Sequence, residues 1–316
     1  MTATVTLADV EAASRRIAGR IRHTPVLDTG LAQAPLGNDW RLALKLECLQ
    51  ITGSFKARGA ASTLTALSEA EVKRGLVTAS GGNHGLGVAY AGWSAGAPVR
   101  IYLPSNTPPV KAEKLATWGA EVVMHGSVWD EANEAAMAAA EAEGLTYVHP
   151  FADPRVIAGQ GTAALELLQQ VPESDVLVVA IGGGGLIAGM AVAAKALKPD
   201  IVVIGVEPVG APTHFESRKA GRLVTLERID TAANTLAPRR SAELNLDLIG
   251  RHVDDIVLVD DAAMRRAARW LWSEFGIAAE LSGAAAVAAL QDSAYVPPAG
   301  SNVAALVCGA GTDGLD

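Results

Sequence analysis

The sequence has little cysteine, few aromatic residues and no excess of positive charge. Its two cysteines, Cys48 and Cys308, show no paired or metal-like spacing, which argues against a disulfide framework or a zinc site and favours a reducing compartment. Aromatic residues make up 4% of the 316 residues, and the formal net charge is -8. Such a chain lacks the basic or aromatic surface that binds nucleic acids or anionic lipids. We therefore expect a small-molecule partner, no nucleic acid and no membrane.

A secretory signal is also missing, because residues 1–22 mix acidic and basic side chains without a long apolar segment. We expect a cytoplasmic protein. One uncharged run, residues 176–194, is long enough to cross a bilayer, yet four consecutive glycines, 182–185, stand in it. Glycines would expose the backbone of a membrane helix, so this run is interpreted as a buried strand, a glycine turn and a packed helix.

Apolar runs of strand length alternate with segments of helical spacing, which is the βαβ pattern of parallel sheets. Strands are expected over 42–46, 76–79, 99–103, 121–124, 176–181, 201–206, 256–259 and 303–308. Helices are expected over 7–20, from 56 onward, and over 84–96, 108–118, 128–143, 157–170, 185–197, 261–275 and 282–292. The pattern predicts an α/β fold of two lobes, each a mainly parallel sheet flanked by helices. Residues 207–247 show no clear period.

The segment 52–60, TGSFKARGA, places Lys56 in the first turn of an expected helix, with Ser54 as its N-cap. The positive end of the helix dipole and an apolar surround both disfavour an ammonium ion there. A neutral, nucleophilic amine of this kind suits Schiff-base chemistry. The alternative is an ordinary solvated lysine, and only the neighbouring segments favour the first interpretation.

Two glycine-rich turns follow expected strands. Gly182–Gly185 opens a helix, so its N–H groups can hold a phosphate. The dinucleotide spacing G-x-G-x-x-G is absent, because Ile187 occupies the last glycine position, and a lone phosphate fits better. The turn Ser80–Gly85 offers backbone donors for a carboxylate, although an ordinary N-capped turn would read the same.

Four other residues near strand or helix ends have ordinary explanations. Cys308 follows the last expected strand and fits a buried core thiol. His84 fits a residue that caps its own helix. Glu207 and Glu280 are of a type that is more often solvated than catalytic.

Together these segments resemble the fold type II family of pyridoxal-phosphate enzymes, in particular its threonine/serine dehydratase and serine racemase branch. Segment 52–60 is similar to the cofactor-lysine motif, 80–84 to the substrate-carboxylate loop and 182–186 to the tetraglycine phosphate loop. Segments 203–208 and 306–309 extend the similarity, which begins near residue 24. The resemblance implies a two-lobed fold like that of tryptophan synthase β.

The resemblance also implies domains and residue roles. A large cofactor-binding domain would comprise residues 1–70 and 152–316, and a small substrate-loop domain residues 71–151. Lys56 would bond to the aldehyde of pyridoxal 5'-phosphate, Asn83 to its ring hydroxyl, and Cys308 would face its ring nitrogen. The other cofactor-binding residues would be Phe55, Gly182, Gly183, Gly184 and Gly185. The substrate would contact Ser80, Gly81, Asn83 and His84.

The chain departs from the family pattern at several positions. Gly81 replaces a second serine of the carboxylate loop. Some relatives bind a divalent cation through Glu and, six positions on, Asp; here these positions are Glu207 and Thr213, so no metal is expected. Leu281 replaces a usual proline, with no predicted effect. Because the sequence stops at Asp316, a regulatory domain and feedback control are not expected.

The activity implied is that of an ammonia-lyase, which converts a β-hydroxy amino acid, L-threonine or L-serine, to a 2-oxo acid and ammonia. A homodimer is expected from the same resemblance. Alternatives within the fold are serine racemisation, β-replacement as in cysteine synthases, or dehydration of 3-hydroxyaspartate, phenylserine or a product of hydroxyectoine breakdown. An alternative of another class is a non-catalytic binding protein that keeps the fold.

Overall fold

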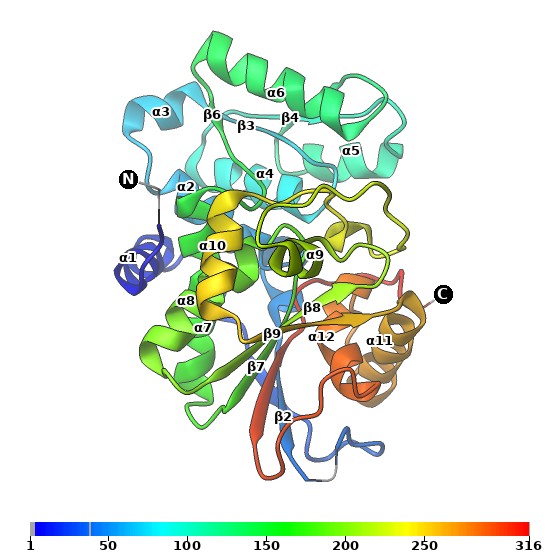
Figure 1. Cartoon of the computed structure of the whole chain (residues 1–316). Coiled ribbons are helices and arrows are strands. Elements are labelled where there is room, and N and C mark those ends of the chain that lie inside the picture. The colour runs from blue at the N-terminus through cyan, green and yellow to red at the C-terminus, as the bar shows by residue number, and fades with distance from the viewer. Residues whose placement is uncertain (1–3, 38, 316) are drawn as a thin grey trace.

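The computed structural model describes residues 4–37 and 39–315, which build two sheets stacked one above the other (Figure 1). The larger sheet has the strand order β1-β2-β10-β7-β8-β9. Its strands are β1 Val26–Asp28, β2 Arg41–Lys45, β7 Val176–Ala180, β8 Val202–Pro208, β9 Asp255–Val259 and β10 Asn302–Leu306. All neighbours are parallel except β1 and β2, which are antiparallel. The short edge strand β1 was not predicted.

The smaller sheet is parallel throughout, with the order β5-β4-β3-β6. Its strands are β3 Leu76–Ala79, β4 Val99–Leu103, β5 Glu121–Met124 and β6 Thr146–Tyr147. The predicted two-lobed α/β fold with mainly parallel sheets is confirmed. Every predicted strand is present within two residues of its expected ends, whereas the two-residue strand β6 was missed.

Helices cover both faces of each sheet, as parallel strands require. In the large lobe α7 and α8 lie on one side and α11 and α12 on the other, while α6 covers the outer face of the small sheet (Figure 1). The helices are α1 Leu7–Ile17, α2 Lys56–Leu64, α3 Glu69–Arg74, α4 Asn83–Ala95, α5 Pro109–Ala116, α6 Trp129–Glu143, α7 Pro154–Gln170, α8 Gly185–Leu197, α9 Thr213–Ala220, α10 Glu243–His252, α11 Asp261–Phe275 and α12 Leu281–Gln291. Within the described residues, no helix combines the length and hydrophobicity needed to span a membrane.

The unassigned region 207–247 contains α9, the start of α10 and a 3-10 turn, η3 Asn234–Leu236. These elements are short, and loops separate them. Helix α9 buries only Thr213, His214 and Ser217, all of them polar. A stretch with so few apolar contacts leaves no periodic signal in the sequence.

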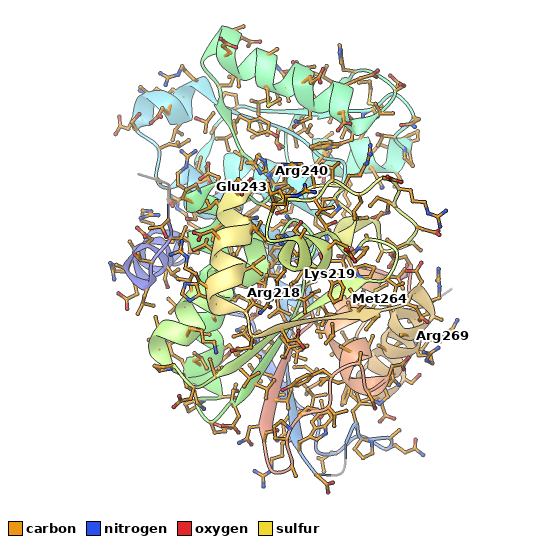
Figure 2. All side chains as sticks on the ribbon, viewed as in Figure 1. Arg218, Lys219, Arg240, Glu243, Met264 and Arg269 are labelled. Carbon is orange, nitrogen blue, oxygen red and sulfur yellow. The ribbon has the colours of Figure 1, made fainter. Side chains whose placement is uncertain are left out.

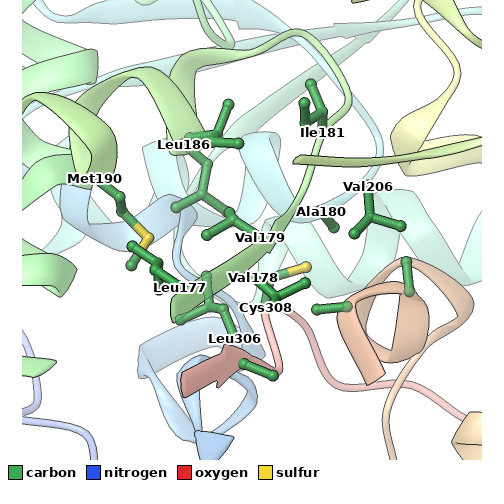
Figure 3. Close-up of a cluster of buried hydrophobic side chains, with 14 of the residues drawn as sticks. Leu177, Val178, Val179, Ala180, Ile181, Leu186, Met190, Val206, Leu306 and Cys308 are labelled. Carbon is green, nitrogen blue, oxygen red and sulfur yellow. The ribbon is translucent and has the colours of Figure 1, made fainter. Parts of the chain in front are cut away.

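The core of the large lobe explains the uncharged run in the sequence. All five residues of β7 are buried, as expected for a central strand with helices on both faces. Figure 3 shows the side chains of Val178 and Leu306 grouped with the thiol of Cys308 below the glycine turn. The core therefore ends directly beneath the site described next.

Candidate active site

One cavity of about 1050 Å³ collects every residue that the sequence singled out for the cofactor or the substrate. Loops that follow β3, β7 and β10 line it, together with the start of α2. The carboxyl ends of parallel strands are where ligands bind in open α/β sheets. Its predicted residues are Phe55, Lys56, Ser80, Gly81, Asn83, His84, Gly182, Gly183, Gly184, Gly185 and Cys308. Their gathering agrees with the predicted roles, which themselves stay predictions.

Lys56 is the first residue of α2 and lies half-buried in the cavity wall. Its Nζ donates a hydrogen bond to the carbonyl of Pro150 at 2.7 Å and lies 5.1 Å from the centroid of the Phe55 ring. Loss of solvent lowers the pKa of this amine to about 8, against a smaller opposing effect of Cys308 and Glu280. The amine is therefore far easier to deprotonate than that of a surface lysine.

The N-cap of this helix differs from the prediction. Phe55 occupies the N-cap position, and Ser54 stands one residue earlier in extended backbone that pairs with Gly309. The Ser54 hydroxyl is buried without a hydrogen-bond partner. The prediction failed because a tertiary bridge, invisible in the sequence, holds Ser54 in the strand-like conformation.

The glycine loop 182–185 connects β7 to α8 and can only be made of glycine. A Cβ on Gly183 would lie 2.2 Å from the Phe151 ring, and one on Gly185 would lie 2.5 Å from the Phe151 carbonyl oxygen. Gly184 has a φ of +91°, in the region that L side chains rarely adopt. The loop ends in the first turn of α8, whose N–H groups have no partner within the helix. This end of the cavity therefore offers backbone donors that suit an anion, and the phosphate role of the loop stays a prediction.

The second loop, 80–83, presents backbone donors from the small lobe. The Ser80 hydroxyl accepts a hydrogen bond from the Gly82 N–H at 3.3 Å, which folds the loop into a turn. A Cβ on Gly81 would meet only Leu103 and Thr107 methyl groups, at 3.3 and 3.4 Å, and the Cδ of Lys111 at 3.7 Å. Position 81 therefore contributes no hydroxyl to the cavity.

His84 does not cap its helix, so that interpretation is wrong. Its Nε2 lies 3.0 Å from the Thr78 hydroxyl and 2.9 Å from the Val148 carbonyl. Burial lowers the pKa of the ring to about 3, so the imidazole is neutral, with its proton on Nε2 facing the carbonyl. His84 links the carboxylate loop to the end of β6, and its direct contact with a substrate stays a prediction.

His149 lines the cavity and was missed in the sequence. Its Nδ1 accepts hydrogen bonds from the N–H groups of Phe151 and Ala152, at 3.1 and 2.9 Å. Burial lowers its pKa to about 4, so the proton of the neutral ring is on Nε2. Its position two residues after β6 is the signal that could have found it, had so short a strand been recognised.

Glu280 also lines the cavity, which corrects the expectation of a solvated side chain. Its Oε1 accepts hydrogen bonds from Asn83 Nδ2 at 2.8 Å and from the Ser282 hydroxyl at 2.5 Å. Burial raises the pKa of this carboxyl above its ordinary value. Cys308 lies close by with its Sγ 3.4 Å from the Ser282 carbonyl, and burial raises the pKa of the thiol, which stays protonated. Glu280 thus fixes the orientation of Asn83.

Glu207 is likewise buried and not solvated. Its two carboxylate oxygens accept hydrogen bonds from the N–H groups of His214 and Phe215, both at 2.8 Å. Thr213 Oγ1 donates to the Pro238 carbonyl at 2.6 Å. Among the residues with described positions, no group of three His, Cys, Asp or Glu side chains is arranged to hold a metal ion. Glu207 therefore supplies acceptors for two backbone N–H groups in the first turn of α9, which have no partner within that helix.

Comparison with known proteins identifies the family. Residues 17–309 match the family described as pyridoxal-phosphate dependent enzyme. The chain is 38% identical to an L-threonine ammonia-lyase of Thermotoga maritima over 98% of this chain and 76% of that protein. It is also 38% identical to a serine racemase of Oryza sativa subsp. indica, over 89% and 82%. The solved structure of maize serine racemase superposes with a TM-score of 0.92 at 34% identity, covering 98% and 94%.

The chain belongs to the family of pyridoxal-phosphate dependent enzymes. The predicted family, fold type, enzyme class and cofactor are confirmed, and the non-catalytic alternative is set aside.

The polar groups that line the cavity suit pyridoxal phosphate. An amine of lowered pKa, the N–H groups of a glycine loop and the thiol of Cys308 all border one space. Its volume lies at the upper end of that usual for small-molecule sites, so a substrate has room beside the cofactor.

Proposed function

We propose that the protein is an ammonia-lyase that acts on L-threonine or L-serine and releases a 2-oxo acid and ammonia. The observation that carries this proposal is that Lys56, an amine of lowered pKa, lines the same cavity as Gly81, a position that offers no acid. The similarity to an L-threonine ammonia-lyase over nearly the whole chain supports it.

Different residues are proposed to bind the cofactor, bind the substrate and transfer the proton. Lys56 would hold the cofactor through its amine, and the same amine would take the proton from the substrate Cα. The N–H groups of 182–185 would hold the phosphate, and Asn83, oriented by Glu280, would face the ring hydroxyl. The loop 80–84 would hold the substrate carboxylate. Pyridoxal phosphate supplies the electron sink that makes the Cα–H bond acidic.

Cys308 shapes which reaction follows. A thiol is a weak donor, and here its hydrogen is directed at the Ser282 carbonyl. A ring nitrogen beside this thiol would therefore gain little positive charge, and the bound cofactor would supply a moderate electron sink, which favours elimination of the β-hydroxyl.

Racemisation is the second candidate, because a serine racemase is as similar in sequence as the ammonia-lyase. It requires one acid/base group on each side of the planar Cα, and a positioned acid contributes roughly 10²- to 10⁴-fold. Lys56 serves one side. In the racemases that the chain resembles, the second serine of the carboxylate loop serves the other, and Gly81 lacks it.

Chiral analysis of L-serine incubated with the enzyme, with pyruvate followed in parallel, separates the two activities. We expect pyruvate with at most traces of D-serine. Gly81→Ser should gain racemisation, because a side chain at position 81 needs only small shifts of flexible methyl groups at 3.3 and 3.4 Å. D-serine formed by the wild type as fast as pyruvate would refute the proposal.

The proposal also includes two domains, a large one of residues 1–70 and 152–316 and a small one of residues 71–151. They are supported by the strands of the small sheet, all of which fall between residues 76 and 147. It also includes a cytoplasmic location, supported by the two cysteines, Cys48 and Cys308, which form no disulfide, and a homodimer, supported by family resemblance alone. Analytical ultracentrifugation tests the last point.

A further inference from the structure

The carbonyl group of Gly183 is held by two side chains from the region that showed no pattern in the sequence. Asn245 Nδ2 donates to the Gly183 oxygen at 2.5 Å, and the Ser241 hydroxyl donates to the same oxygen at 2.9 Å. Asn245 Nδ2 also donates to the Phe151 carbonyl at 3.2 Å. Both residues lie at the start of α10, which Glu243 marks in Figure 2 at the level between the two lobes.

The two carbonyl groups fix which way the Asn245 amide points. Turning the amide over would place its oxygen against the oxygens of Gly183 and Phe151, so the nitrogen must face them. Its own Oδ1 is then left buried with no hydrogen-bond partner. Asn245 is fully buried, and a buried acceptor without a partner is unfavourable and uncommon in proteins. The arrangement therefore costs some folding stability, and its effect is to fix the position of one glycine carbonyl.

Holding that carbonyl fixes the direction of the next N–H group. In a planar trans peptide the C=O of Gly183 and the N–H of Gly184 point in opposite directions. The surroundings require glycine here, because a Cβ on Gly183 would meet the Phe151 ring and a Cβ on Gly184 would meet the His214 ring. With its carbonyl held by Asn245 and Ser241, the peptide directs its N–H away from these two oxygen contacts, and Gly184 itself lines the cavity.

We infer that Asn245 and Ser241 are positioning residues that aim the Gly184 N–H at the cofactor phosphate. The inference rests on the proposed role of the glycine loop. Asn245 lies behind the cavity lining, whereas Ser241 is part of it, and neither lay in a segment that the sequence marked as functional. Without them the peptide between Gly183 and Gly184 is free to rotate, since glycine restricts it least of all residues.

The experiment compares the affinity of the cofactor-free protein for pyridoxal 5'-phosphate and for pyridoxal, which lacks the phosphate. Absorbance titration gives both Kd values. The Kd of pyridoxal divided by the Kd of pyridoxal 5'-phosphate reports what the phosphate contributes to binding. The variants are Asn245→Asp, which replaces the donor by an acceptor of the same shape, and Ser241→Ala. Asn133→Asp is the matched control, because Asn133 accepts a hydrogen bond from Tyr147 and lies outside the cavity.

We expect Asn245→Asp to lower the ratio at least tenfold and Ser241→Ala about threefold, with pyridoxal affinity nearly unchanged and the control like the wild type. Equal weakening of both ligands, or an unchanged ratio, would overturn the inference. Should Asn245→Asp fail to fold, as judged by circular dichroism, Ser241→Ala decides alone. A wild type that does not distinguish the two ligands would refute the phosphate role of the loop itself.

Discussion

The lowered pKa of Lys56 makes a quantitative prediction about how fast the enzyme takes up its cofactor. Only the neutral amine attacks an aldehyde, so the rate of uptake follows the deprotonated fraction of Lys56. With a pKa of about 8 in place of 10.5, that fraction at pH 7 is about one tenth instead of about three in ten thousand. Burial therefore raises the reactive population roughly 300-fold at neutral pH.

The sign of the pH dependence follows from the direction of this shift. Below pH 8 the folded protein holds Lys56 mostly as ammonium, and the rate should rise about tenfold per pH unit. Above pH 8 the amine is mostly neutral and the rate should level off. A surface lysine would instead keep accelerating to above pH 10.

Rapid mixing of cofactor-free enzyme with pyridoxal phosphate, followed by visible absorbance between about pH 6 and pH 10, measures this profile. Parallel reactions with Nα-acetyl-lysine, whose amine is unperturbed, cancel the titration of the cofactor itself. Lys111→Met is the matched control, because Lys111 also lines the cavity and should not affect the inflection. An inflection near pH 10.5 in the wild type would show that the cavity does not desolvate Lys56.

Other predictions concern the same cavity. Borohydride reduction of the cofactor-bound enzyme followed by peptide mapping should label Lys56, and a label on Lys45 would contradict the site assignment. Gly184→Asp should weaken cofactor binding by a hundredfold or more, since its Cβ would lie 2.5 Å from His214 Nε2 at a φ of +91°; titration with pyridoxal phosphate would expose an unchanged affinity. Chelator treatment should leave activity within about twofold, because the oxygens of Glu207 and Thr213 are engaged within the protein, and a loss restored by Mg²⁺ or Ca²⁺ would disprove this.

The sequence predicted what depends on local pattern. The strands and helices of both lobes have clear periods, and ligand loops were found because they sit at strand ends where parallel sheets bind ligands. The glycines 182–185 were singled out for that reason, and Lys56 because it opens a helix; the roles of both stay predictions.

What the sequence did not predict depends on contacts between distant segments. Glu280 looks like any surface glutamate until Asn83 is brought against it. Asn245 lies more than sixty residues from the carbonyl it holds. No periodic signal marks a polar side chain that serves a distant backbone group, so such residues emerge only from the folded structure.

The position of Lys56 depends on a network of buried charged side chains around helix α2. Arg58, two residues further along α2, is fully buried and donates to Glu47 at 2.7 and 2.8 Å and to Glu166 at 2.7 and 2.8 Å. Lys45 donates to the same Glu166 at 2.9 Å. These bonds tie α2 to β2, to the turn after it and to α7.

Such a network is a weak source of net stability, because desolvation of the charges offsets much of their attraction. Its effect is instead to fix the position of helix α2. Loss of one partner leaves an unpaired buried charge at a cost of roughly 3–5 kcal/mol, a large share of the 5–15 kcal/mol that stabilises a typical domain. A shift of α2 along its axis would break several of these bonds at once, whereas an apolar contact tolerates sliding. Lys56 is thus held in register by charged groups that lie outside the cavity lining.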